Sequence, residues 1–321
     1  MRCRKCGTKA VINMRQHKLA LCKEHFLEWL PEQVQRFIHK YQMFTPKQRV
    51  LVAVSGGKDS LSLWDILWRL GYQADGLYIE LGIGGDDHSS GYSAESYRLS
   101  QQFAKQRGLH LLVEDVQQNY GETIPVMARL TNHGKEKPCS VCGLTKRHIM
   151  NRVAREGKYD VLVTGHNLDD EAAVLLGNTL NWIPGYLVRQ APVLEANRPG
   201  LVKKAKPLCR VYERDMAAYA LLRGIDYIYE ECPHAAGSNT IYYKELLNKL
   251  EADRPGAKLN FYLSFLKAKE NGLFAQQADP EVENLHTCPS CGQPTSAPGF
   301  CAFCRLIERV EDNQRLDISA D

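Results

Sequence analysis

Long apolar stretches are missing from this sequence of 321 residues. No apolar run approaches the roughly 18 residues that a membrane-spanning helix needs, so we expect no association with a membrane. The first six residues, MRCRKC, lack the apolar core of a secretory signal, and we therefore expect a cytoplasmic protein. Long internal repeats are absent as well, and a hydrophobic fraction of 44% excludes a disordered or fibrous chain.

Net charge is also small, because 41 Lys and Arg against 37 Asp and Glu leave +4. That balance indicates no partner by itself. The charges are unevenly placed, however: residues 1–60 carry 12 basic and 4 acidic residues, whereas residues 274–321 carry 3 basic and 8 acidic residues. We therefore expect an anionic partner near the N-terminal half, with RNA as a candidate.

Cysteine, by contrast, is abundant, with eleven residues in the chain. A reducing compartment disfavours disulfides, so metal or redox chemistry is the expected use. Two sets have the spacing of closed tetrahedral zinc sites. The N-terminal set is Cys3, Cys6, Cys22 and His25, and the C-terminal set is Cys288, Cys291, Cys301 and Cys304. We expect small zinc-binding domains at residues 1–30 and 274–321, flanking a larger domain at 31–273.

Short apolar runs alternate with helical patterns through the larger domain. Candidate strands lie at 49–54, 76–81, 110–113 and 161–164, and the apolar residues between 63 and 70 recur at helical spacing. This alternation predicts an α/β fold with a doubly wound parallel sheet. Residues 238–272 read as helical with a break at Pro255 and Gly256, and 274–286 reads as a polar linker.

A glycine-rich turn, Ser55-Gly56-Gly57-Lys58-Asp59-Ser60, follows the first of these strands and opens a helix. Backbone N–H groups at a helix N-terminus favour an anion, and glycine lets the main chain approach a phosphate. The turn lacks the Walker A spacing, because Val52 stands where the first glycine would be and Asp59 follows the lysine. A generic kinase or GTPase is therefore disfavoured.

With the later segment Gly165-His166-Asn167-Leu168-Asp169-Asp170, this turn resembles the PP-loop ATP pyrophosphatases. The resemblance implies that ATP is cleaved to AMP and pyrophosphate as a substrate oxygen is adenylated. It implies phosphate binding by residues 55–60, adenosine near Tyr78 to Gly82, and ATP contacts from Gly165 and Asp170, with Mg²⁺ beside Asp170. We expect one of Asp169 and Asp170 to cap the following helix, and Asp170 to act in the reaction.

The central cysteines leave several chemistries open. Cys139 and Cys142 form a CxxC pair, and Cys232 lies in the segment EECPH. The spacing fits an incompletely ligated iron–sulfur cluster, a zinc site completed by His234, or a redox pair that carries a persulfide. The remaining cysteine, Cys209, matches no motif, and we expect it to be a packed thiol.

The whole chain resembles the TtuA-type tRNA 2-thiouridine synthetases, through its cysteine sets together with SGGKDS, CSVCGLTK, GHNLDDEA and EECPHA. The resemblance implies a 4Fe-4S cluster on Cys139, Cys142 and Cys232 whose fourth iron binds sulfide, and catalytic roles for Lys146 and Asp170. Lys58 would neutralise charge that develops on the phosphates.

The resemblance also implies a tRNA substrate, modified at uridine 54 in the T loop, with a thiocarboxylated ubiquitin-like carrier as sulfur donor and a homodimeric assembly. The related wobble-uridine thiolases, which act in the anticodon, are the alternative. A non-catalytic zinc-ribbon RNA-binding protein with a nucleotide-sensing loop is a second alternative, but it leaves the central cysteines without a use.

Overall fold

The computed structural model describes residues 1–84, 91–131, 138–197, 199–235, 237–275 and 285–318. Its centre is a six-stranded sheet in the order β5-β4-β3-β6-β8-β7. The strands are β3 (Val50–Val54), β4 (Ala74–Glu80), β5 (Leu111–Asp115), β6 (Val161–Thr164), β7 (Val193–Leu194) and β8 (Lys203–Ala205). All neighbours pair in parallel except β7 and β8, which are antiparallel. The expected parallel sheet is therefore confirmed, with an antiparallel edge strand that was not predicted.

Strand β3 shows why the sheet is buried on both faces. In the run Val50–Val54, Val50, Val52 and Val54 pack into one core cluster, whereas Leu51 packs into the cluster on the opposite face. Side chains alternate across a strand, so an uninterrupted apolar run needs cover on both sides. Helices supply that cover, and the fold is the three-layer α/β arrangement that the alternation predicted.

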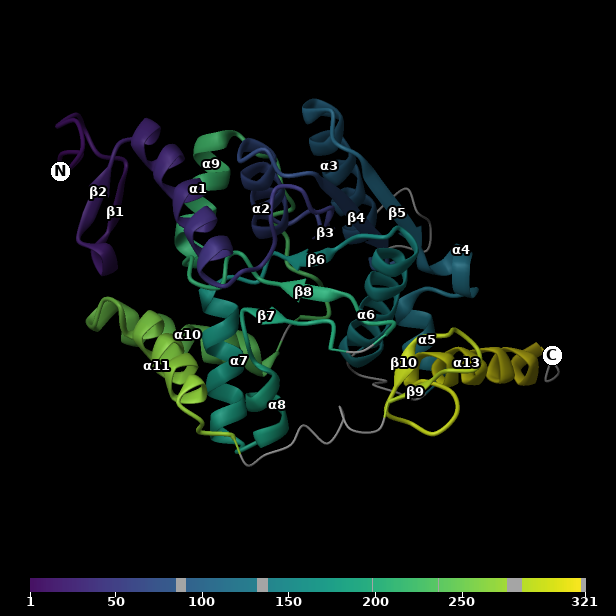
Figure 1. The fold of residues 1–321 in the computed structure, drawn as a ribbon. Coiled ribbons are helices and arrows are strands. Elements are labelled where there is room, and N and C mark those ends of the chain that lie inside the picture. The colour runs from purple at the N-terminus through teal and green to yellow at the C-terminus, as the bar shows by residue number, and fades with distance from the viewer. Residues whose placement is uncertain (85–90, 132–137, 198, 236, 276–284, 319–321) are drawn as a thin grey trace.

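Figure 1 shows the two helical layers. The first layer packs on the Val50 face, and the second packs on the Leu51 face around Leu77 and Leu162. The first contains α1 (Lys23–Lys40), α2 (Lys58–Arg69), α3 (Gly91–Arg107), α7 (Leu168–Leu180) and α9 (Glu213–Arg223). The second contains α4 (Val116–Tyr120), α5 (Ile124–Leu130), α6 (Cys139–Glu156) and α13 (Ala302–Ile318).

A helical hairpin follows the sheet. It consists of α10 (Asn239–Asp253) and α11 (Ala257–Glu270), and both helices contact α7, which leads into the short α8 (Pro184–Arg189). The hairpin turns at Gly256, whose φ of 97° lies in the left-handed region that glycine tolerates. The predicted helical segment and its break are therefore confirmed. None of the described helices has the length and apolarity to cross a bilayer.

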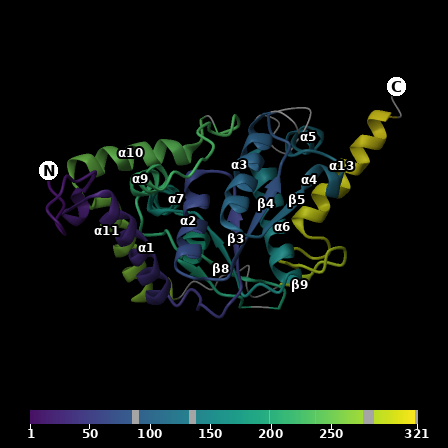
Figure 2. The same ribbon diagram turned by 90° about the horizontal axis from the view of Figure 1, so that it is seen from above.

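The two cysteine-bearing ends lie at opposite ends of the molecule (Figures 1 and 2). The N-terminal end contains the antiparallel pair β1 (Ile12–Met14) and β2 (Leu19–Leu21), joined by a 3-10 turn at Arg15–His17. The C-terminal end contains β9 (His286–Thr287) and β10 (Pro294–Thr295), followed by α13. Helix α1 runs across the predicted boundary at residue 30, and most of the predicted linker at 274–286 lies outside the described residues.

Candidate functional site

The candidate nucleotide site lies where three neighbouring strands end. Strands β3, β6 and β8 are adjacent, and each leads into a helix, α2, α7 and α9 respectively. The chain reverses direction across the sheet between β3 and β6, because β4 and β5 lie on one side of β3 and β8 on the other. In open α/β sheets, ligands bind at such a switch point, where helix N-termini present N–H groups to an anion.

The glycine-rich turn is shaped for an anion. Gly56 has a φ of +73°, and a Cβ there would lie 2.6 Å from the carbonyl oxygen of Ser96, so only glycine fits. At Gly57, which precedes the first residue of α2 and makes no side-chain cap, a Cβ would meet only the Ser55 hydroxyl, at 3.5 Å. The hydroxyls of Ser55 and Ser60 lie 3.1 Å apart. The turn is therefore closed on one side and open in front of the helix N-terminus.

The second loop is held against the first. A Cβ on Gly165 would lie 2.9 Å from the backbone nitrogen of Ser60, so glycine allows this close approach. Asn167 is the N-cap of α7, and its side chain accepts hydrogen bonds from the N–H groups of Asp169 and Asp170. In return, Asp170 Oδ2 accepts from the Asn167 N–H at 2.9 Å, completing a capping box.

One of the two aspartates caps the helix, as expected, and that residue is Asp170. Asp169 does not cap α7, because its Oδ2 accepts from the backbone N–H of Glu213 and its Oδ1 pairs with the buried Lys258. Asp170 caps the helix with one oxygen and leaves the other for further contacts. The cause is the asparagine before the helix, whose short side chain takes the N-cap position and moves the reciprocal contact to the third helical residue.

Five charged side chains alternate in sign across the site. Lys58 Nζ donates to Asp59 Oδ2 at 3.1 Å and to Glu213 Oε1 at 2.7 Å. Lys244 Nζ donates to Glu213 Oε2 at 3.1 Å and pairs with Asp170 Oδ1 at 2.5 Å. Burial raises the pKa of Asp59 to about 6, although Lys58 opposes the shift. Without nucleotide, both lysines are therefore bonded to carboxylates of the protein.

Sequence reasoning missed two of these residues. Glu213 begins α9 and Lys244 lies in α10, and neither belongs to a recognisable motif. Only the position of Glu213, soon after a strand and at the start of a helix, was a usable signal. Lys244 had none, because its role depends on how α10 packs.

Tyr78 and Gly82 lie in and just after β4, the strand next to β3. The Tyr78 ring is buried, and its hydroxyl donates to the Ser93 carbonyl oxygen at 2.8 Å. Gly82 has a φ of +65°, and a Cβ there would meet the Thr123 side chain. Contact of either residue with adenosine stays a prediction.

The structure gathers both terminal cysteine sets. In each set the four ligand atoms lie within 4.8 Å of one another. At the N-terminus, His25 Nδ1 lies 3.2 Å from Cys22 Sγ and 3.5 Å from Cys3 Sγ. At the C-terminus, Cys291 Sγ lies 3.8 Å from Cys301 Sγ. These distances fit four donors around a single ion, so both sets could hold a metal.

Backbone N–H groups favour the thiolate form of one cysteine in each set. Burial acts to raise the pKa of Cys3, but hydrogen bonds from loop N–H groups outweigh it and lower the value to about 6. The same opposition of burial and backbone N–H groups lowers the pKa of Cys288 to about 6. A thiolate is the form that ligates metal, so both loops are suited to metal before any ion binds.

The three central cysteines are neighbours without forming such a tight set. Cys139 Sγ lies 3.5 Å from the carbonyl oxygen of His234, which joins the start of α6 to the segment that carries Cys232. Burial raises the pKa of Cys142, and the charges of Cys232 and Cys139 add to the shift. Among the described residues, the three do not gather their sulfurs within 4.8 Å. Cysteine thiolates are the ligands that hold iron–sulfur clusters, so these three residues could hold one.

Lys146 lies one helical turn after Cys142 on α6 and acts on its thiol, lowering the pKa against the effect of burial. Among the described residues, no hydrogen bond or ion pair joins Lys146 to Asp170. Cys209 is fully buried, and burial raises its pKa to about 12, which confirms the packed thiol.

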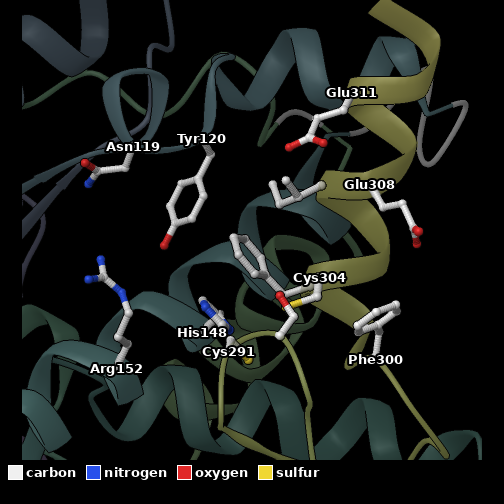
Figure 3. A pocket seen from close by; sticks show the side chains of 12 residues that line it. Asn119, Tyr120, His148, Arg152, Cys291, Phe300, Cys304, Glu308 and Glu311 are labelled. Atoms are coloured by element: carbon white, nitrogen blue, oxygen red, sulfur yellow. The ribbon is translucent and has the colours of Figure 1, made fainter.

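A separate pocket of about 570 Å³ lies between α6 and the C-terminal end (Figure 3). Tyr120 and Arg152 line one side, and Phe300 and Glu311 line the other. The imidazole of His148 stacks on Phe303 at 3.8 Å, and burial lowers its pKa to about 4. The pocket includes Cys291 and Cys304 of the C-terminal set and none of the nucleotide-site residues.

Comparison with known families agrees with these sites. A family described as "PP-loop domain" matches residues 30–235, and one described as "2-thiouridine synthetase TtuA, N-terminal LIM domain" matches residues 2–27. The chain is 50% identical to the tRNA-5-methyluridine(54) 2-sulfurtransferase of Thermus thermophilus, over 97% of this chain and 92% of the relative. It is 30% identical to the cytoplasmic tRNA 2-thiolation protein 1 of Chlamydomonas reinhardtii, over 99% of this chain and 87% of the relative.

A solved structure shares the fold. The U34-tRNA thiolase NcsA from Methanococcus maripaludis, determined with its [4Fe-4S] cluster, aligns with a TM-score of 0.76 at 23% identity and covers 96% of each chain. A PP-loop match over more than half of the chain, together with a half-identical relative along nearly all of it, confirms the resemblance drawn from the motifs. The chain therefore belongs to the PP-loop family of TtuA-type tRNA 2-sulfurtransferases.

Proposed function

We propose that this protein replaces the 2-oxygen of uridine 54 in tRNA with sulfur, at the expense of ATP. The observation that carries the proposal is the site at the switch point, where the phosphate turn and the Asp170 loop meet. The relative with 50% identity carries position 54 in its name, whereas the wobble uridine appears only in the name of a far more distant structure. Position 54 is therefore favoured.

The reaction is an adenylation followed by a displacement. The uracil O2 attacks the α-phosphorus of ATP, and pyrophosphate leaves. A sulfur nucleophile then attacks C2, and AMP departs with the former O2. Lys58 and the N–H groups at the start of α2 bind the phosphates where negative charge develops. Asp170 Oδ1, which pairs with Lys244 in this structure, is the proposed ligand of Mg²⁺, a cation that prefers carboxylate and phosphate oxygens.

The proposed ligands of a 4Fe-4S cluster are Cys139, Cys142 and Cys232. Such a cluster would have three protein ligands and would supply the chemistry of sulfur delivery. The proposed zinc ligands are the two terminal sets, which contain Cys3 and Cys288 respectively. The positive charge on Lys146 lies beside Cys142 and is placed to stabilise anionic sulfur or the departing oxygen.

The remaining partners follow from the family resemblance. We propose a thiocarboxylated ubiquitin-like protein as the sulfur donor, a homodimer as the assembly, and the cytoplasm as the location. The basic residues at 1–60 suit contact with the tRNA backbone, which is the sequence-independent part of RNA binding.

The first experiment is an anaerobic reaction of reconstituted protein with ATP, Mg²⁺, sulfide and unmodified tRNA. Nuclease digestion and mass spectrometry then locate any added sulfur. We expect 2-thiouridine, or its 5-methyl form, in the T loop. Sulfur in the anticodon would instead move the protein to the wobble-uridine thiolases. If no sulfur is added, tRNA-dependent AMP formation separates an enzyme that lacks its donor from a binding protein.

Replacement of a cluster ligand tests the chemistry. Cys139→Ala should abolish both the iron content and the thiolation, because only two cluster ligands remain, while the zinc content is unchanged. Iron and zinc are measured by elemental analysis. Cys209→Ala is the matched control, since that buried thiol lies outside all three sets. Normal thiolation by Cys139→Ala under strict anaerobiosis would overturn the cluster mechanism.

A further inference from the structure

The PP-loop match ends at residue 235, yet the charged network at the site is completed by a helix beyond it. Lys244 comes from α10 and contacts both Asp170 and Glu213. Its side chain is 22% exposed, the same fraction as that of Lys58. The two lysines thus stand at similar depth on either side of Glu213.

The position of Lys244 is fixed by how α10 packs on α7. The Tyr243 ring lies so close to Gly177 that a Cβ there would approach it to 2.9 Å. One turn further along α10, Leu247 is buried against Ala172 and Ala173. Small residues on α7 therefore let α10 approach closely, and the residue next to Tyr243 reaches Asp170 at the beginning of α7.

The contacts of Lys244 overlap with those expected of a metal. One oxygen of Asp170 is committed to the capping box, so Oδ1 is the oxygen left for a cation, and Lys244 holds it. A divalent ion and an ammonium group cannot share one carboxylate oxygen without strong repulsion. Binding of the metal would release Lys244 from Asp170 while Glu213 still holds it beside the site.

The net charge of the five-residue network favours a phosphate as the next partner of the released ammonium group. The five side chains carry three carboxylates and two lysines, so the nucleotide-free network has no positive excess to offer a triphosphate. Burial alone would lower the pKa of Lys244, but the charges of Asp170 and Glu213 raise it above its ordinary value. The lysine is therefore a permanent cation at the edge of the phosphate site.

We propose that Lys244 is a second phosphate-binding lysine, which exchanges Asp170 for the ATP phosphates when magnesium and ATP bind. The inference rests on the proposed use of ATP at this site and adds a residue to it. Glu213 is the shared carboxylate that keeps Lys58 and Lys244 in place before binding. The phosphate site is then built by α2 on one side and by α10 on the other.

Nucleotide binding tests the proposal without any thiolation. The affinity of the Mg²⁺ complex of α,β-methylene-ATP, which cannot release pyrophosphate, is measured by calorimetry alongside the affinity of AMP. Lys244→Met should weaken binding of the analogue by about tenfold to a hundredfold, as expected for loss of a charged hydrogen bond. AMP affinity should change by less than about threefold. Lys244→Arg should restore most of the loss, because it retains the charge.

Lys249→Met is the matched control, since Lys249 is exposed on the same helix. If Lys244→Met does not fold, Lys244→Gln decides, because glutamine keeps hydrogen bonds to both carboxylates without the charge. Analogue binding by a folded Lys244→Met or Lys244→Gln that is as tight as in the wild type, or tighter, would overturn the proposal. Wild-type protein that binds the analogue but forms neither thiolated tRNA nor tRNA-dependent AMP would overturn the proposed function alone.

Discussion

Two buried carboxylates of this protein, Asp65 and Asp215, differ in their hydrogen-bond partners and in their pKa values. Asp65 is fully buried, and burial would raise its pKa, but contacts from Arg223, Tyr219 and Arg107 lower it. Asp215 is buried as well, and among the described residues the one side chain that donates a hydrogen bond to it is the neutral Gln16, at 3.2 Å. Burial raises the pKa of Asp215 to about 7. The first carboxylate is stabilised in its charged form, and the second is not.

Asp215 should therefore make stability depend on pH. Its folded-state pKa of about 7 lies above its ordinary value of 3.8, so the native state binds a proton that the unfolded state releases. The free energy of unfolding should fall as pH rises from about 4 to about 7. Asp215→Asn should remove this loss and stabilise the protein by about 1–3 kcal/mol at pH 8, with little effect at pH 4. Urea unfolding at pH 4 and pH 8 measures the free energy of unfolding of both proteins. An equal effect of the substitution at the two pH values would contradict the prediction.

Residues in local motifs could be predicted, and residues joined only by packing could not. The phosphate turn and both terminal cysteine sets are continuous or closely spaced in sequence, so spacing alone carries their chemistry. Glu213 and Lys244 lie 155 and 186 positions after Lys58 in the chain, within ordinary helical sequence. Their meeting depends on the order of strands in the sheet and on the approach of α10 to α7, neither of which a single sequence reveals.

At the scale of elements, the site depends on how closely two loops approach each other. The loop after β6 touches the turn after β3 at Gly165, where a Cβ would also lie 3.1 Å from the carbonyl carbon of Asp59. Both contacts involve backbone atoms, which cannot swing away as a side chain can. The separation between the phosphate turn and Asp170 therefore depends on glycine at position 165, which has no Cβ.

Gly165→Ala should push these loops apart and weaken binding of Mg²⁺–α,β-methylene-ATP by about tenfold, because small misplacements at such sites are costly. The fold should survive with a loss of about 1–3 kcal/mol from overpacking. Gly185→Ala is the control, since a Cβ there meets nothing within 4 Å; it should bind nucleotide normally. Calorimetry measures both variants, and unchanged affinity in Gly165→Ala would show that the loops can relax.

Strands β3 to β6 were predicted closely, because they are apolar, β-branched and long enough to leave a pattern. Strands β8 and β7 were missed. Strand β8 is three residues long and contains Lys203 and Lys204, and β7 has two residues. Strand β7 is an edge strand of the sheet, and β8 lies between it and β6. Both strands are too short for a period-two pattern to stand out, so their sequences do not differ from those of loops.

At the scale of the whole molecule, the two ends relate differently to the core. Cys3 and Cys22 belong to the large core cluster that also contains the helices of the first layer. Cys288 and Cys301 belong to a small cluster with Phe303. A metal at the N-terminal set therefore supports the main core, whereas one at the C-terminal set supports a local cluster.

If each terminal set holds one zinc ion, as proposed, Cys3→Ser and Cys288→Ser should each remove one ion per chain, as measured by elemental analysis. Cys3→Ser should lower the midpoint of the main thermal transition by about 5 °C or more, whereas Cys288→Ser should shift it by less than about 2 °C. Calorimetry of the two variants measures the midpoint of the thermal transition in each. Equal shifts would show that both ends are coupled to the core to the same degree.

The strand order has a consequence for synthesis on the ribosome. Strands β3, β4 and β5 are adjacent and consecutive in the chain, so this half of the sheet can pair while the rest is still being translated. The phosphate turn is present at that stage, but Asp170, Glu213 and Lys244 are added later. A nascent chain therefore displays the turn before the residues that the finished fold brings beside it, and the full set is present only once α10 has emerged and docked.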